Sequence, residues 1–150
     1  MVNRRVLVLL VSTVIALIGG YAAYNHMFST TTSYANYSAP AFEAGATDEQ
    51  RIFQLQSDLG NAAAEMAQLQ DMAKRLQFGK MKAMGRHLQE VAAELEPRLD
   101  EIEDPAARAM LTRGITGLRT VGEGSQELDR DKSMRGVNEV LTAFDQLNDR

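Results

Sequence analysis

Apolar residues recur at alternating intervals of three and four residues over 52–76, and this spacing constrains the fold more than any other feature of the chain. The pattern places a narrow apolar stripe along one side of an α-helix, which is typical of helices that pair along their length in coiled coils. The stripe is either internal to the domain or partly available to a partner helix or a second copy of the chain. Its candidate interaction residues are Ile52, Leu55, Leu59, Met66, Leu69 and Leu76.

The start of this helix is marked by a capping pattern, and its end by a possible break. Thr47 is followed by two acidic residues and then Gln50, an arrangement that predicts a capping box at the helix start. A turn near Gly79 would pair this helix with the next one as an antiparallel hairpin. Without that turn, residues 48 to about 96 would form one rod of roughly 70 Å. We expect the hairpin, because the later helices need a compact partner.

Two further helices are expected in the last third of the chain. Asp104-Pro105 predicts a helix start, since Asp is a good N-cap and Pro fits the first helical position. This third helix is expected to end near Val121, before the glycines at 122–124, with Ser125 capping a last helix. The sequence therefore predicts an all-α fold, a hairpin or small bundle of three to four helices over 48–150.

The first two dozen residues contain an uncharged apolar run. Arg4 and Arg5 precede nineteen such residues, Val6 to Tyr24, and a helix of that length spans roughly 28 Å, close to the thickness of a bilayer core. We therefore expect a transmembrane anchor within 6–28 and a cytoplasmic flank at 1–5. The alternative is a cleaved signal peptide, with small residues near position 20 as a possible cleavage point.

Both interpretations place the bulk of the chain outside the cytoplasm. After the apolar run the next basic residue is Arg51, so the positive-inside rule keeps the N-terminus cytoplasmic. Residues 29–47 are rich in Ser, Thr, Ala, Tyr and Gly, which predicts a flexible linker. The expected location is the cell membrane with a single span, and the periplasmic side if the source is a Gram-negative bacterium.

Composition disfavours several classes of function. The chain has no cysteine and no tryptophan, and its formal net charge is −4. Disulfides, thiolate metal sites and a concentrated basic surface for nucleic acid are therefore not expected. His26 and His87 are the only histidines, and no P-loop, nucleophile elbow or His-Glu-x-x-His motif is present. We expect neither an enzyme nor a bound cofactor.

One short motif has ligand-binding chemistry. Met81, Met84 and His87 fall on adjacent helical turns, and thioether and imidazole groups are ligands for Cu(I) or axial ligands for haem. The plainer interpretation is that both methionines fill the core and His87 lies at its edge.

Charges are segregated along the chain. A basic patch without an intervening acid is followed by an acidic stretch at 90–104. The basic part is suited to an anionic lipid surface or an acidic partner, and the acidic part to a hard divalent cation, although the calcium-loop pattern is missing. Solvated helix faces are the simpler explanation. The basic patch consists of Lys74, Arg75, Lys80, Lys82 and Arg86.

These features together predict a membrane-anchored, extracytoplasmic helical protein that acts by protein–protein interaction, as an accessory or assembly subunit or an adaptor. The alternatives are an exported metal- or small-ligand-binding protein using Met and His, and a sensory accessory protein. No assembled set of residues predicts a reaction.

Overall fold

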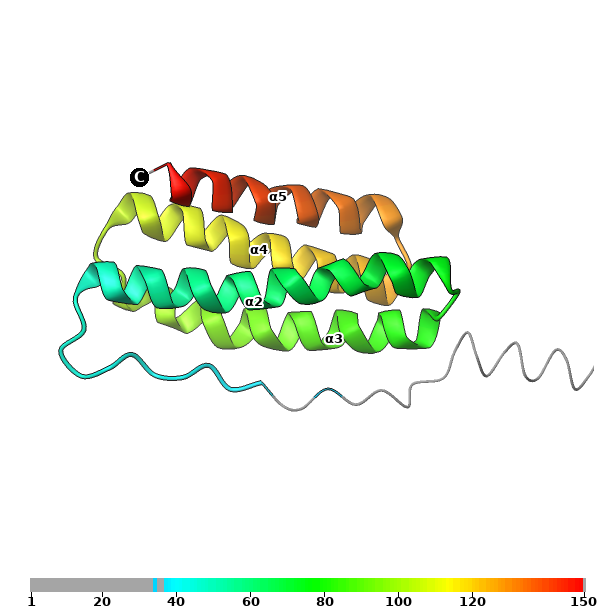
Figure 1. The fold of residues 1–150 in the computed structure, drawn as a ribbon, viewed down its shortest axis with the longest axis horizontal. Helices are drawn as coiled ribbons and strands as arrows, with labels where there is room; N and C mark the ends of the chain where they lie inside the picture. The colour runs from blue at the N-terminus through cyan, green and yellow to red at the C-terminus, as the bar shows by residue number, and fades with distance from the viewer. Residues whose placement is uncertain (1–33, 35–36, 150) are drawn as a thin grey trace, which may run out of the picture.

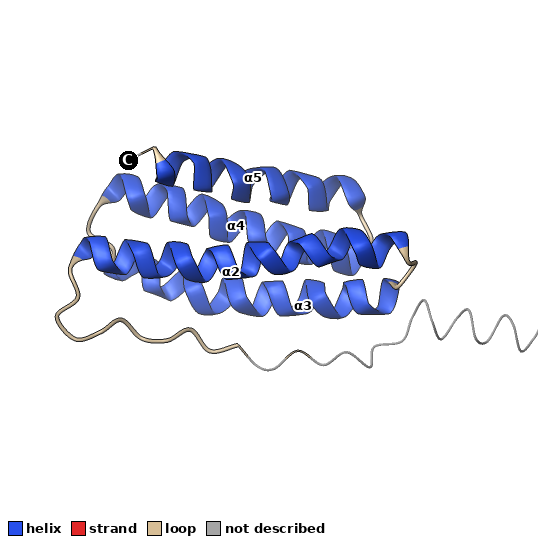
Figure 2. Ribbon diagram, in the orientation of Figure 1, coloured by secondary structure: helices blue, strands red, loops and turns tan. Residues whose placement is uncertain are grey.

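Four α-helices pack side by side in the described part of the chain. The computed structural model describes residue 34 and residues 37–149, and the predicted anchor lies outside them. Successive helices run in opposite directions (Figures 1 and 2), which confirms the prediction of a small all-α bundle. The elements are α2 (Asp48–Lys74), α3 (Phe78–Leu95), the 3₁₀ helix η1 (Glu96–Glu101), α4 (Pro105–Glu127) and α5 (Arg130–Asn148).

Helix α2 begins and ends with recognised capping geometry. At its start the hydroxyl of Thr47 accepts from the Gln50 amide, and the Gln50 side chain accepts from the Thr47 amide, which confirms the predicted capping box. At its end the amide of Gln77 donates to the carbonyl of Met72, 2.9 Å away, and Leu76 takes the left-handed conformation at φ 56°. This is a Schellman ending, and it produces the α2–α3 hairpin instead of a continuous rod.

Replacing Leu76 by glycine is expected to raise the free energy of unfolding by about 0.5 to 1 kcal/mol, because a left-handed backbone is strained for any residue with a Cβ. The side chain is 46% exposed, so the packing that is lost offsets only part of the relieved strain. Leu141→Gly is the matched control, since Leu141 is 54% exposed but lies within α5. That change should lower stability by about 1 kcal/mol. Chemical denaturation measures both, and a loss of stability in both variants would contradict the prediction.

The connection between α3 and α4 is tied to the start of α2. Helix α3 ends at Leu95, and η1 contains Pro97 near its first position. Asp104 then caps α4 by accepting from the amides of residues 106 and 107, as predicted. The carboxylate of Asp48 accepts from the amides of Glu103 and Asp104 at 2.7 and 2.9 Å. One acidic residue thus holds two segments of the chain together.

Helix α4 is longer than the sequence predicts. It was expected to end near Val121, but it continues through the glycines to Glu127, and Asp129 caps α5. Ser125, the predicted cap, is a buried residue inside α4. The physical reason is packing: a Cβ on Gly122 would lie 2.6 Å from the carbonyl oxygen of Gly85 in α3. The glycines therefore allow close helix contact, which offsets their poor helix propensity.

The core lies between the helices and contains the apolar stripe of α2 together with one face of each of the others. Helix α4 approaches both of its neighbours closely, at Gly122 on Gly85 of α3 and at Gly117 on Gly136 of α5. Fully buried leucines from three helices fill the interior, among them Leu55, Leu59, Leu88, Leu95, Leu111 and Leu118.

Candidate functional site

A surface segment covers α2 and α3, and we call residues 34 and 37–47 the strap. The strap runs alongside the bundle before α2 begins (Figure 1). Tyr34, Tyr37, Ala39 and Phe42 are partly buried and pack against the core. The sequence predicts a flexible linker here and does not predict these contacts.

The first polar cluster under the strap joins Tyr34, His87 and Glu65. The Nε2 atom of His87 lies 2.9 Å from Oε2 of Glu65, an ion-pair distance whenever the imidazole is protonated. The ring of Tyr34 stacks on the imidazole with centroids 4.8 Å apart and planes inclined by 17°. Nδ1 of His87 is buried and has no hydrogen-bond partner. His87 therefore joins α2, α3 and the strap.

The second polar cluster is a buried ion pair beneath Phe42. The Nη1 atom of Arg98 lies 2.7 Å from Oδ2 of Asp58, and the two side chains are 8% and 15% exposed. The guanidinium carbon lies 4.2 Å from the centroid of the Phe42 ring, within the range of a cation–π contact. Nε and Nη2 of Arg98 have no hydrogen-bond partner. The ring of the strap and the carboxylate of α2 thus provide the main compensation for this buried charge.

The phenols of the strap are held in their neutral form. Burial, followed by the nearby Glu65 carboxylate, raises the pKa of Tyr34 above its ordinary value near 10. Burial also raises the pKa of Tyr37, with Asp58 adding to the rise and Arg98 opposing it. Ionising either phenol would place a negative charge beside an acidic residue in a partly buried site.

The strap is therefore expected to detach in alkali. A phenol whose pKa is raised on packing contributes stability that is complete below the ordinary pKa near 10 and is lost as pH rises through the raised pKa. Tyrosinate absorbance of the wild type minus that of Tyr34→Phe isolates the titration of Tyr34. Its midpoint should be higher in the native chain than in denaturant. Equal midpoints in the two states would contradict the prediction.

The predicted metal-ligand motif is divided between the core and the strap contact. Met84 is fully buried in the core, Met81 is partly buried against it, and His87 is paired with Glu65. Within residues 34 and 37–149, no group of three or more His, Cys, Asp or Glu side chains is arranged to hold a metal ion. Each member of the motif therefore has a packing or pairing contact within the bundle.

The apolar seam of α2 is largely internal. Ile52, Leu55, Leu59, Met66 and Leu69 are all buried in the core, whereas Leu76 is exposed in the α2–α3 turn. The seam is thus used to pair α2 with the rest of the bundle, which is one of the two possibilities that the sequence leaves open.

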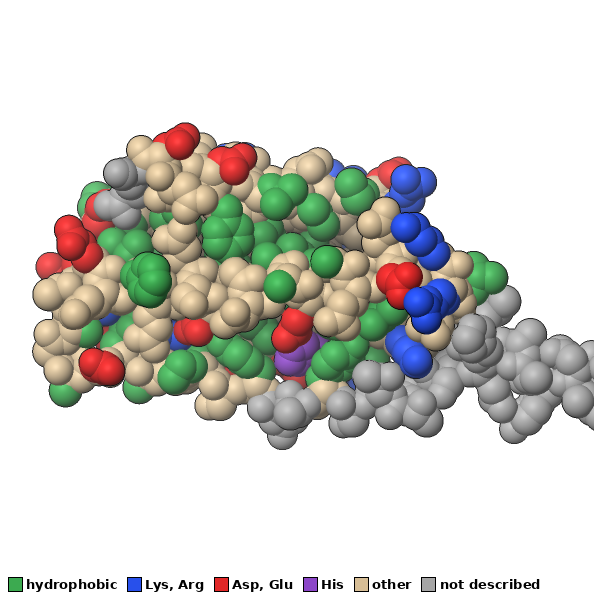
Figure 3. Space-filling model, viewed as in Figure 1, with side chains coloured by type: hydrophobic (Ala, Val, Ile, Leu, Met, Phe, Trp, Pro, Cys, Tyr) green, Lys and Arg blue, Asp and Glu red, His purple; other side chains and the backbone are tan. Residues whose placement is uncertain are grey.

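The basic patch gathers around the α2–α3 turn. Figure 3 shows Lys and Arg side chains clustered at this end of the molecule. Arg75 pairs with Asp71 at 3.1 Å. Among the described residues, Lys74, Lys80, Lys82 and Arg86 form no ion pair.

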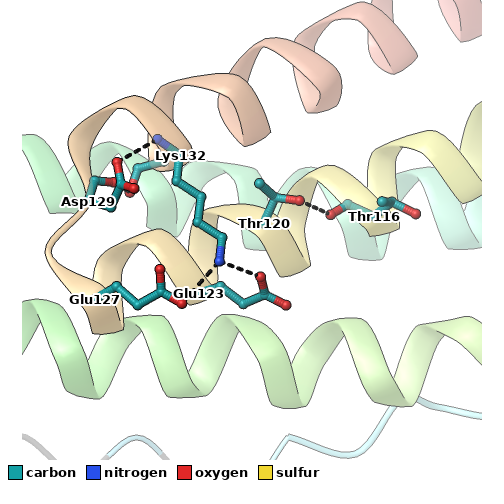
Figure 4. Close-up of polar contacts among 7 residues, drawn as sticks. Thr116, Thr120, Glu123, Glu127, Asp129 and Lys132 are labelled. Carbon is teal, nitrogen blue, oxygen red and sulfur yellow. Dashed lines mark hydrogen bonds and ion pairs between the residues drawn. The ribbon is translucent and has the colours of Figure 1, made fainter.

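The α4–α5 turn lies at the same end and contains one lysine that is fully engaged. The Nζ atom of Lys132 lies 2.9 Å from Glu123 and 3.0 Å from Glu127, as Figure 4 shows. These hydrogen bonds, first that of Glu123 and then that of Glu127, raise the pKa of Lys132. The backbone amide of Lys132 also donates to the Asp129 carboxylate. Lys132 therefore joins α4 to α5 and contributes little to the free positive charge of the patch.

The structure reveals an apolar surface that the sequence does not predict, which we call the α2–α5 face. Phe53 is 73% exposed and lies seven residues before Gly60, on the same side of α2. A Cβ on Gly60 would lie 3.6 Å from the ring of Phe144 in α5. On α5, Met134 and Leu141 are exposed at a spacing of seven residues. Helical periodicity shows which apolar residues share one face of a helix, but it does not show which of them remain exposed to solvent in the folded bundle.

Hydrophobic side chains are also visible between α2 and α5 in the space-filling view (Figure 3). A hydrogen bond of 3.0 Å from Gln56 to Asn148 crosses the face between Phe53 and Gly60. The α2–α5 face is therefore an apolar surface interrupted by one polar contact.

Comparison with known proteins provides no relative from which to assign a function. No family model matches the chain, and no similar protein is found among curated proteins or solved structures. Over the part of the chain that the structure describes, none of the helices has both the length and the hydrophobicity to cross a membrane.

Proposed function

We propose that the protein is a single-pass, membrane-anchored helical bundle on the extracytoplasmic side that acts by binding another protein, as an accessory or assembly subunit or an adaptor. The observation that carries this proposal is the α2–α5 face. Phe53, Met134 and Leu141 are each about half exposed or more. Large apolar side chains that share one exposed surface are typical of protein–protein contacts.

The geometry of this face suits a helical partner. Phe53 and Gly60 form a row along α2, and Met134, Leu141 and Phe144 form a row along α5. An amphipathic helix binds such paired rows by placing its own apolar residues between them. Gly60 has no side chain, which leaves room next to the Phe144 ring.

The membrane anchor in this proposal is supported by the sequence. Arg4 and Arg5 precede the apolar run Val6 to Tyr24, and the next basic residue is Arg51. This asymmetry favours an N-terminus in the cytoplasm and a bundle on the opposite side.

Site-specific photo-crosslinking in intact cells of the source organism tests the binding function. A photoreactive residue at Leu141 is expected to produce a discrete adduct of higher mass, whereas one at the exposed Glu90 of α3 should not. Phe53→Gln should weaken the Leu141 adduct, because it removes apolar area from the facing row. Leu76→Gln is the matched control, since it changes an exposed apolar residue outside the face.

The mass of the adduct distinguishes the possible partners. An adduct of twice the chain mass would assign the face to a second copy of the chain. Absence of a discrete product from Leu141, or equal products from Leu141 and Glu90, would rule out this face as the binding surface.

A further inference from the structure

The strap approaches the bundle near one particular end. Tyr34 stacks on His87, which by its position in α3 lies about 13 Å from the α2–α3 turn. From there the strap runs away from this turn, because Phe42 lies over Arg98, beyond the end of α3. At Tyr34 the direction of the strap therefore points back toward the α2–α3 turn (Figure 1).

The two ends of the bundle differ in charge. The end formed by the α2–α3 and α4–α5 turns contains the basic patch, of which Lys74, Lys80, Lys82 and Arg86 have no acidic partner among the described residues. Of the acidic residues at this end, Asp71 pairs with Arg75 and two glutamates pair with Lys132. Asp129 caps α5, and Asp131 forms no ion pair among the described residues. The opposite end contains Asp48, Glu49, Glu96, Asp100, Glu101 and Glu103.

We propose that the end of the bundle with the α2–α3 turn faces the membrane and that its basic patch docks on anionic lipid headgroups. This inference rests on the proposed anchor. It adds to the proposed function an orientation and a second binding surface, and it leaves the α2–α5 face directed sideways and accessible to a partner.

Chain length supports this orientation. Nine residues lie between Tyr24, at the end of the apolar run, and Tyr34, and the ten Cα-to-Cα steps reach at most about 35 Å. The basic end lies about 13 Å from the Tyr34 contact. The acidic end lies about 24 Å from the Tyr34 contact in the other direction. If that end faced the membrane, the chain between Tyr24 and Tyr34 would have to turn back along the bundle and would use most of its reach. An anionic surface would also repel the acidic end.

The test uses the full chain reconstituted in vesicles of phosphatidylcholine, with or without phosphatidylglycerol. The chain has no cysteine, so Gln70→Cys near the basic end and Asp100→Cys at the acidic end each allow a single fluorescent label. A quencher attached to the lipid headgroups reports proximity to the surface. In anionic vesicles the label at position 70 should be quenched and the label at position 100 should not.

Charge removal tests the docking contact itself. Each basic residue near an anionic surface changes the docking equilibrium about fivefold, so Lys80→Gln with Lys82→Gln should lower the ratio of docked to undocked chain on the order of 25-fold. Arg113→Gln with Arg119→Gln is the matched control, because it also removes two positive charges but from positions along α4. The control should leave the quenching at position 70 unchanged.

Two outcomes would overturn the inference while the anchor stands. If the label at position 70 is quenched equally in neutral and anionic vesicles, anionic headgroups are not what binds the basic patch. The patch would then be assigned to an acidic protein partner. Stronger quenching at position 100 would reverse the orientation. Retention of the chain in the vesicles after an alkaline wash reports the anchor separately, and a chain that washes off would overturn both the anchor and this inference.

Discussion

Asp58→Ala is expected to lower the free energy of unfolding by about 3 to 5 kcal/mol, the range found when one partner of a buried ion pair is removed. The Arg98 guanidinium is almost fully buried, and Asp58 accepts a hydrogen bond of 2.7 Å from its Nη1 atom. Two of its nitrogen atoms already lack a partner. Without the carboxylate, the buried positive charge would be compensated mainly by the ring of Phe42. Urea denaturation measures the loss.

Two comparisons separate the buried charge from other effects of the substitution. Asp71→Ala removes an acid from the same helix, but its pair with Arg75 is more than half exposed, so the expected cost is at most about 1 kcal/mol. Replacing both members of the buried pair, with Asp58→Leu and Arg98→Met, should restore most of the stability, because no unpaired charge then remains. Equal losses for Asp58→Ala and Asp71→Ala would show that the buried pair has no special role.

Gly122→Ala should be the second most damaging change, with a loss of about 2 kcal/mol after the gain in helix propensity. The added methyl group would lie 2.6 Å from the carbonyl oxygen of Gly85, a backbone atom that cannot rotate away. Helices α3 and α4 would have to separate, and the apolar contacts along both would weaken. Thermal unfolding followed by circular dichroism measures the change.

Gly60→Ala is the matched control for this prediction. It is the same substitution within a helix, but the new methyl group would meet only the Phe144 ring at 3.6 Å, an ordinary contact distance. The variant should therefore be unchanged or more stable by up to about 1 kcal/mol, since alanine favours the helix. A loss at position 60 equal to that at position 122 would mean that close helix approach is not the cause.

Features encoded by neighbouring residues were predictable from the sequence. The capping box at Thr47 and the cap at Asp104 depend on contacts within one helical turn, and both were predicted correctly. The stripe of α2 was identified because its residues share one helical face. The hairpin near Gly79 was also expected, although the turn itself is made by the left-handed Leu76.

Features that depend on distant residues were not predictable in the same way. The glycines at 122 and 124 predict the end of a helix, because helix propensity describes an isolated helix. In the bundle, Gly122 instead packs against Gly85 of another helix. The sequence predicts a flexible linker at the strap because this segment is rich in small and polar residues. Its contacts join residues far apart in the chain, such as Phe42 with Arg98, and no local pattern reports them.

The same applies to the candidate site. The sequence shows that Phe53 and Leu141 are apolar, but their exposure depends on how α2 and α5 pack in the bundle. The basic patch was visible as a run of charges, whereas its position beside the α4–α5 turn required the fold.

The path of the strap also determines how the bundle would respond to mechanical load. Any pull on the chain ahead of Tyr34 reaches α2 only through the strap, whose contacts run from Tyr34 on His87 to Phe42 over Arg98, with Tyr37 packed between them in sequence. A force directed along the bundle axis shears these contacts together, so they share the load. A sideways force would peel them one at a time, beginning at Tyr34, and the helices themselves would be loaded only after Phe42 had left Arg98.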